Sequence, residues 1–342
     1  MKPFKLLVLA SLGLSTSIST FAELEIITVT ATKREASLQE VPIAVTAMTG
    51  DQLKNAGITD VRELATLSPS FNGTSSSSET GGTALRIRGV GTTGNNIGLE
   101  SAVGVFIDGV YLSRPGIALT DLVDIERIEI LRGPQGTLFG RNTSAGALNI
   151  MTQKPSLDQS HFWANATIGN FNAVGYQVGG TLPLIDNELG MRFSATKRSQ
   201  DGFSQSVTSG NDSITRDRYS FKSQLLWAGD ENVELRLIGD YSDADEQCCD
   251  AAIMTESPLA LAGIYALAGL PANGGVEAFG QQAFEDRLTN GDVNYNTSKQ
   301  FGLSAHLDWD LDWAKFTGAY SRSMSLSNKG ALFQFIATIP MR

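Results

Sequence analysis

The C-terminal half of the chain alternates apolar and polar residues with a period of two, a pattern typical of β-strands that have one apolar face. We predict seven such strands after Pro155. Each has about the length of ~9–11 residues that crosses a bilayer at a tilt. The predicted strands are Phe162–Ile168, Val174–Leu182, Leu189–Thr196, Arg218–Trp227, Val233–Leu237, Phe301–Trp309 and Trp313–Ser323.

The connections between these strands alternate in length, apart from a first tight turn at Asn170–Ala173. Short turns on one side and long loops on the other are typical of an outer-membrane barrel, whereas a soluble β-sandwich, the alternative, has no such asymmetry. The short connections are Leu184–Glu188, Ala228–Asn232 and Asp310–Asp312, and the long ones are Gln200–Arg216 and Ser242–Ser298.

Three tryptophans, Trp227, Trp309 and Trp313, lie beside the short turns, where an interfacial aromatic girdle is expected. Seven strands do not close a bacterial barrel, which has an even number of strands. An open sheet in lipid leaves backbone groups unpaired along its edges. We therefore expect residues 157–342 to be the first, truncated part of a barrel, and the chain to be the N-terminal portion of a longer protein.

Residues 38–156 show a different pattern and predict a small α+β domain. Pro42–Met48 is a predicted strand, and Thr49 with Gln52 forms a capping box that begins a helix. Asp60 and Glu63 repeat this start signal for a second helix. The domain thus combines short helices with short strands.

The stretch Asp124–Lys154 organises this domain. Two β-branched or apolar segments, Ile125–Leu131 and Ala147–Met151, enclose a dense series of backbone breakers. Proline fixes φ, whereas glycine accepts positive φ, so the density predicts several tight turns. The breakers are Gly133, Pro134, Gly136, Gly140 and Gly146.

Gly89–Gly94 matches the dinucleotide pattern GxGxxG, but no helical period follows it. A pyrophosphate site needs the amides of a helix N-terminus at this point, so we interpret the segment as a glycine-rich loop. Val103–Val110 contains Asp108-Gly109, a turn signal that predicts a hairpin.

The N-terminus predicts a secretory signal peptide over residues 1–22, with Lys2 and Lys5, the apolar segment Leu6–Leu14 and small residues before Glu23. The mature chain then begins with the β-prone segment Glu25–Thr32. Such a segment suits addition to the sheet edge of another protein. An edge strand of its own domain is the equal alternative.

Composition and charge narrow the function classes. An apolar content of 42% predicts a folded chain, and the net charge of −10 argues against a nucleic-acid partner. The only histidines, His161 and His306, are far apart, and adjacent Cys248 and Cys249 give no zinc spacing. We therefore expect no catalytic residues, no enzyme activity, no metal site and no cofactor.

Four motifs resemble TonB-dependent outer-membrane receptors: Glu25–Ala31, Leu85–Gly91, Val105–Tyr111 and Glu126–Ile150. The first is similar to the TonB box and the others to the plug domain of that family. The resemblance implies a TonB-box segment over residues 23–37, a plug domain over 38–156, and part of a roughly 22-stranded transmembrane barrel. It also implies energy-dependent uptake driven by the inner-membrane TonB complex.

The resemblance also assigns residues to roles. It places TonB binding at Ile26, Ile27, Thr28, Val29, Thr30 and Ala31. It makes Arg88 and Arg132 plug–barrel contacts whose acidic partners lie in later strands. It assigns ligand binding to plug loops containing Ser76, Ser77, Ser78, Thr92, Thr93, Asn95 and Asn96.

The resemblance to iron-complex receptors implies TonB-dependent uptake of a scarce nutrient across the outer membrane, with an iron–siderophore complex as the leading ligand. The expected partners are TonB, outer-membrane lipid and a small-molecule ligand that is a ferric chelate. Haem, vitamin B12 and oligosaccharides remain open as ligands. A passive porin-like or adhesin barrel is the alternative function, although neither needs a TonB box or a plug.

Overall fold

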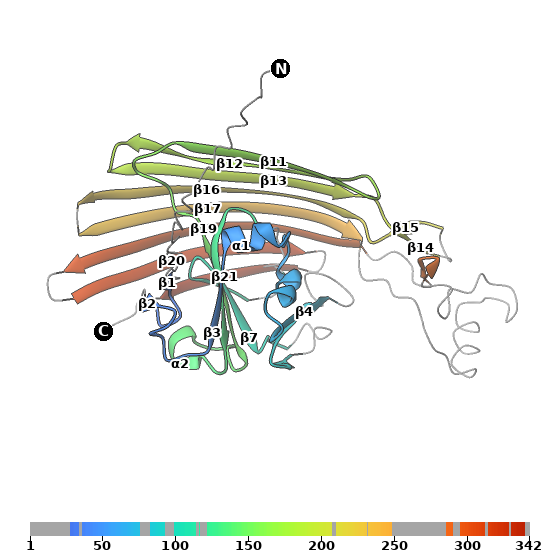
Figure 1. Ribbon diagram of the computed structural model, residues 1–342, viewed down its shortest axis with the longest axis horizontal. Helices are drawn as coiled ribbons and strands as arrows, with labels where there is room; N and C mark the ends of the chain where they lie inside the picture. Colours follow the sequence, from blue (N-terminus) through green and yellow to red (C-terminus); the bar gives the residue numbers. More distant parts are fainter. Residues whose placement is uncertain are drawn as a thin grey trace, which may run out of the picture.

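In the computed structural model, an α+β plug domain packs against one face of a long antiparallel sheet, which we call the wall (Figure 1). The wall strands follow the long axis of the molecule. The structure describes residues 28–33, 36–75, 83–92, 99–113, 116, 122–206, 210–230, 232–247, 285–289, 295–311, 314–327 and 330–338.

The plug domain is built on a five-stranded sheet in the order β3-β9-β10-β7-β8, in which only β10 and β7 are parallel. Its strands are β3 (Val45–Thr49), β9 (Ile125–Arg132), β10 (Gly146–Thr152), β7 (Val103–Ile107) and β8 (Val110–Leu112). A three-stranded sheet lies beside it, formed by β4 (Phe71–Ser75), β5 (Thr83–Ile87) and β6 (Val90–Gly91). The predicted strands at Pro42–Met48 and in Asp124–Lys154, and the hairpin at Asp108, are confirmed.

Both capping boxes form as the sequence predicts. Thr49 and Gln52 cap α1 (Gly50–Asn55), while Asp60 and Glu63 cap η1 (Val61–Thr66). The second element is a 3₁₀-helix of 6 residues, which is longer than most 3₁₀ runs. A third short helix, α2 (Gly136–Phe139), lies among the glycines between β9 and β10.

The core of the plug domain lies between α1, η1 and the two sheets. Its largest fully buried side chains come from η1 and both sheets, and Leu53 of α1 packs against them, so the sheets and helices depend on one another for burial. They include Leu64, Phe71, Leu85, Ile87, Ile128, Ile130, Leu148 and Ile150.

The wall is an eight-stranded antiparallel meander. Its strands are β11 (His161–Gly169), β12 (Ala173–Ile185), β13 (Leu189–Gln200), β16 (Arg216–Asp230), β17 (Val233–Gln247), β19 (Tyr295–Leu311), β20 (Ala314–Ser327) and β21 (Gly330–Thr338). Short strands β14 (Ser204–Ser206), β15 (Asp212–Ser213) and β18 (Leu288–Thr289) form a separate small sheet.

The wall corrects the strand prediction in two ways. First, an eighth strand, β21, follows β20, so the expected number of seven is wrong. Its residues show little polar alternation, which is why the pattern missed it. Second, β17 continues to Gln247 although this part of its sequence is mostly polar. Residues 238–244 pair with both β16 and β19, and residues 245–247 pair with β19. The predicted long loop from Ser242 therefore starts later.

The two faces of the wall have opposite character. Large apolar side chains on the outward face are exposed, among them Tyr176, Val178, Phe221, Leu225, Leu237 and Leu303. The face toward the plug buries polar side chains, among them Thr181, Thr196, Arg218, Gln224 and Arg236. An apolar exterior around a polar interior is the arrangement of a transmembrane barrel and the reverse of a soluble protein.

Two of the predicted girdle residues lie where expected. Trp227 and Trp309 are exposed beside the short turns, while Trp313 lies outside the described residues. Cys248 and Cys249, the signal peptide, and Ile26 and Ile27 also lie outside them. No helix in the described part of the chain is long and apolar enough to cross a membrane.

Candidate functional site: the plug–wall interface and the docked N-terminal segment

The first contact between plug and wall is built around Asp108, at the tip of the β7–β8 hairpin. Asp108 and Gly109 both have positive φ, 47° and 79°, as a two-residue hairpin turn requires. The turn projects the Asp108 carboxylate toward the wall, where it is almost completely buried. An aspartate tolerates this backbone conformation better than most residues do.

Two cations of the wall and one plug threonine surround this carboxylate. Lys222 Nζ lies 3.3 Å from Oδ2, and Arg236 Nη2 lies 3.4 Å from Oδ1. Thr152 donates its backbone N–H to Oδ1 over 2.9 Å and its hydroxyl to Oδ2 over 2.8 Å. The buried charge is therefore paired and hydrogen-bonded on both oxygens, as burial demands.

Gln224 and Arg236 extend this contact into a network. Arg236 donates to Gln224 Oε1 through Nε (2.9 Å) and Nη2 (2.6 Å). The Gln224 amide in turn donates to the Gln153 carbonyl over 3.2 Å. Side chains of the neighbouring wall strands β16 and β17 thus bind the C-terminal end of the plug strand β10.

The network alters the acidity of Asp108. Burial alone raises the pKa of this carboxyl, but Lys222, Arg236 and the two hydrogen bonds from Thr152 outweigh it. The pKa of Asp108 therefore lies below its usual value. The carboxylate stays ionised and keeps the plug attached at neutral pH.

A second contact joins Asp124, just before β9, to Arg192 on β13. Arg192 Nε lies 2.6 Å from Asp124 Oδ2, and the pair is closed by Arg192 Nη2 on Oδ1. Two weaker contacts accompany it: Arg198 donates to Thr59 Oγ1 over 3.2 Å, and Lys154 pairs with Glu234 at the exposed edge over 2.7 Å.

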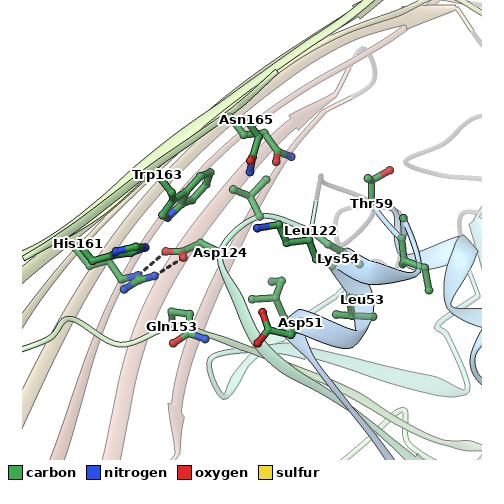
Figure 2. A pocket seen from close by; sticks show the side chains of 17 residues that line it. Asp51, Leu53, Lys54, Thr59, Leu122, Asp124, Gln153, His161, Trp163 and Asn165 are labelled. Atoms are coloured by element: carbon green, nitrogen blue, oxygen red, sulfur yellow. Dashed lines mark hydrogen bonds and ion pairs between the residues drawn. The ribbon is translucent and has the colours of Figure 1, made fainter. Parts of the chain in front are cut away.

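A cavity of about 470 Å³ lies beside the Asp124–Arg192 pair, between α1 and strands β11 to β13. Figure 2 shows His161, Trp163 and Asn165 of β11 facing the helix that carries Asp51 and Lys54. Its lining contains both polar and apolar side chains. It separates the plug from the wall, so here the two are joined by individual contacts and not by continuous packing.

The N-terminal segment, residues 28–33, is docked on the plug. Strand β1 (Thr28–Val29) pairs with β2 (Ala36–Ser37), and Val29 and Ala31 are completely buried. Thr30 donates its backbone N–H to Glu129 Oε1 over 2.8 Å. Strand β1 belongs to a separate two-stranded sheet and is not an edge strand of the five-stranded sheet, and its addition to the sheet of another protein stays a prediction.

Lys33 completes the docking of this segment. Its ammonium lies 4.3 Å from the ring centre of Phe139 and 5.2 Å from that of Phe106, within the range of a cation–π interaction. Burial lowers the pKa of Lys33, and Glu129 opposes this shift only in part. The segment is therefore fixed at both ends of its described length.

The arginines assigned to plug–barrel contact do not meet the described wall. Arg132 donates to the carbonyls of Ala44 and Val45, each over 3.4 Å, and Arg88 is exposed in the β5–β6 turn. Their pairing with later strands stays a prediction. The buried ion pairs of the described interface have the reverse polarity, since the plug acids Asp108 and Asp124 meet wall bases. The exposed pair Lys154–Glu234 keeps a plug base and a wall acid. The turn signal at Asp108-Gly109 marked one of the plug acids, but spacing alone did not reveal its partners.

Among the ligand-binding candidates only Thr92 is described. Its hydroxyl donates to the Glu100 carbonyl and accepts from the Ala102 N–H, both over 3.0 Å. These two bonds join Thr92 to the segment before β7. Ser76, Ser77, Ser78, Thr93, Asn95 and Asn96 lie outside the described residues. Within the described ranges no three His, Cys, Asp or Glu side chains gather as a possible metal site.

The small α+β domain is joined by ion pairs to the polar face of a β-sheet whose other face is apolar. This arrangement is that of an outer-membrane barrel with an internal plug. Residues 37–147 match the TonB-dependent Receptor Plug Domain. Over these residues the chain is similar to the plug domain of TonB-dependent receptors, and the wall that follows is an antiparallel sheet of membrane type.

Curated relatives agree with this assignment. The chain is 28% identical over 215 residues to the pesticin receptor of Yersinia pestis, covering 62% of this chain and 30% of that protein. It is 28% identical over 213 residues to the ferrioxamine B receptor of Salmonella typhimurium, covering 61% and 28%. The chain therefore spans less than a third of the length of these relatives.

Solved structures share the fold. The ferric yersiniabactin uptake receptor of Yersinia pestis superposes with a TM-score of 0.67 at 17% identity, covering 86% of this chain and 43% of that one. The ferripyoverdine receptor of the outer membrane of Pseudomonas aeruginosa gives 0.65 at 16% identity, covering 90% and 37%. The agreement includes both the plug domain and the wall.

Proposed function

We propose that the protein to which this chain belongs imports a ferric siderophore across the outer membrane, driven by TonB. The observation that carries the proposal is a complete plug domain fixed to the polar face of the wall, with a TonB-box-like segment docked on it. A passive pore needs neither feature. The relatives described as a ferrioxamine B receptor and a ferric-pyoverdine receptor support a siderophore as the ligand.

The geometry suggests how import proceeds. Ligand binding on the side of the long loops favours release of residues 28–33 on the opposite side. The released segment pairs with TonB as an added strand. Force on this segment then rearranges the plug and opens a path along the wall. No covalent bond changes in the ligand, so the side chains act by binding and by release.

The test is uptake of radiolabelled iron, supplied as ferrioxamine B and as ferric pyoverdine, in a strain lacking its own receptors. The full-length receptor should support uptake, and deletion of Glu25–Thr32 should abolish it while leaving ligand binding at the cell surface intact. A control variant in which Ser156–Gln159 is replaced by a Gly-Ser linker of equal length tests for general damage to the fold. Undiminished uptake after deletion of the segment overturns the proposal.

The ligand is separated from the alternatives in the same strain. Growth with haem, vitamin B12 or maltodextrin as the limiting nutrient measures each competing substrate. Growth on one of these, without iron uptake, replaces the siderophore assignment but leaves TonB dependence in place. Passive diffusion of small sugars into vesicles containing the receptor favours the porin alternative.

A further inference from the structure

Glu129 holds the N-terminal segment through its side chain. It lies in the middle of β9 and is completely buried. It accepts the Thr30 backbone N–H over 2.8 Å and the Thr30 hydroxyl over 3.2 Å. A carboxylate that accepts a backbone N–H forms a charge-assisted bond, stronger than a bond between neutral groups. A single side chain thus occupies both donors of Thr30.

The orientation of Glu129 is fixed from two further sides. Arg127 Nε donates to Oε1 over 2.9 Å, and Asn149 Nδ2 donates to Oε2 over 3.2 Å. Arg127 is itself paired with Glu126 on the outer side of the strand. The carboxylate is therefore preorganised to receive Thr30, since Arg127 and Asn149 both donate to it.

This contact and strand addition exclude each other. An added strand that pairs through the edge of Thr30 needs its backbone N–H, which Glu129 already occupies. It also needs access to the side chains at 29 and 31, which are completely buried. The segment must therefore leave Glu129 before any partner pairs with it.

We propose that Glu129 is the latch that keeps residues 28–33 unavailable to a strand-adding partner, and that breaking the Thr30–Glu129 contact is the step that exposes them. This proposal depends on the proposed function only for the identity of the partner, TonB. Docking of the segment itself is a property of the plug and is measured without any partner.

The first experiment measures exposure of the segment. Ala31→Cys in the purified full-length receptor, with its other cysteines replaced, is reacted with a bulky maleimide. Glu129→Gln keeps the shape of the side chain but removes its charge and replaces one acceptor oxygen with an amide donor. This donor faces Arg127 and the Thr30 N–H at the Oε1 position, or Asn149 at the Oε2 position. We expect labelling to be at least about tenfold faster in this variant. Thr30→Ala, which leaves the sheet untouched, should accelerate labelling by a smaller factor.

The matched control is Glu234→Gln, the same chemical change at an exposed wall carboxylate that pairs with Lys154 and lies outside the Glu129 network; its labelling rate should equal that of the parent. Equal rates for the parent, Glu129→Gln and Thr30→Ala overturn the latch. Circular dichroism of all variants must be unchanged, and Thr30→Ala keeps the test valid if Glu129→Gln unfolds the plug.

The second experiment titrates the purified periplasmic domain of TonB against receptors with native Ala31. Glu129→Gln should bind about tenfold more tightly than the parent in the absence of ligand. Faster labelling with no TonB binding by any receptor refutes the proposed partner but retains the latch. Normal TonB binding with unchanged labelling refutes the latch but retains the proposed function.

Discussion

Asp124 of the plug and Arg192 of the wall form a two-point ion pair across the lumen interface. Arg192 Nε lies 2.6 Å from Asp124 Oδ2, and Nη2 contacts Oδ1. The Arg192 side chain is only 11% exposed and the Asp124 side chain only 5%, so water screens the pair little. This contact and the Asp108 network fix the plug to the first strands of the wall.

The first prediction concerns this pair. Asp124→Asn or Arg192→Gln should each reduce the free energy of plug unfolding by about 3 kcal/mol, since each leaves a buried charge without its partner. Arg192→Lys should cost less, because it keeps the charge and loses only the two-point geometry. Denaturant unfolding of the full-length receptor, followed by a tryptophan probe in the plug, measures the change.

The exposed pair Lys154–Glu234 is the control for this prediction. Its side chains are 42% and 34% exposed, so Glu234→Gln should change the same free energy by less than about 1 kcal/mol. A double-mutant cycle on Asp124 and Arg192 with no coupling energy contradicts the first prediction.

The second prediction is a pH dependence set by Asp108. Because the folded-state pKa of Asp108 lies below its unfolded value of 3.8, the stabilisation is fully present above that value. It is lost as the pH falls through the folded pKa. Calorimetry of the full-length receptor between about pH 6 and 3 should show a falling plug transition temperature.

Asp108→Asn removes this titration. The variant should be less stable at neutral pH and should show a smaller loss below about pH 4. If the parent and Asp108→Asn lose stability in parallel over the whole range, another carboxyl carries the pH dependence.

The third prediction compares two glycines of the stretch Asp124–Lys154. Gly146 has a φ of 148°, and a Cβ there would lie 2.2 Å from the Leu131 carbonyl oxygen and 2.7 Å from Ile87 Cδ1. Gly146→Ala should therefore destabilise the plug by about 3 kcal/mol. At Gly136, in α2, an added Cβ meets no atom within 4 Å. Gly136→Ala should be neutral or stabilising by about 0.5 kcal/mol. Thermal unfolding that ranks the two variants in the opposite order refutes the prediction.

The fourth prediction tests the outward face of the wall. Phe221 is 47% exposed near the middle of β16, so Phe221→Arg should oppose insertion by about 2–4 kcal/mol. Folding of the full-length receptor into lipid vesicles, titrated with denaturant, gives this value, with Phe221→Leu as the conservative control. If the face were in contact with water, the arginine would change stability by less than about 0.5 kcal/mol.

The sequence by itself determined the elements whose causes are local. The capping boxes at Thr49 and Asp60, the turn at Asp108-Gly109 and the alternation of β12 and β16 all depend on neighbours a few residues away. Short-range sterics and hydrogen bonding therefore make them visible in the pattern. The breakers at Gly133, Gly140 and Gly146 do adopt positive φ, as the density of turns predicted.

Only the tertiary structure decided which surfaces meet. Asp108 pairs with Arg236, 128 positions away, and Thr30 with Glu129, 99 positions away, and no periodicity relates such residues. Strand β17 continues beyond its apolar pattern because ladder pairing with its neighbours, and not lipid contact, holds its polar end. The sequence therefore determined a plug domain and a membrane-type wall, since local rules specify both. The charges that join them and the docked position of residues 28–33 required the fold, because burial and pairing arise only when distant segments meet.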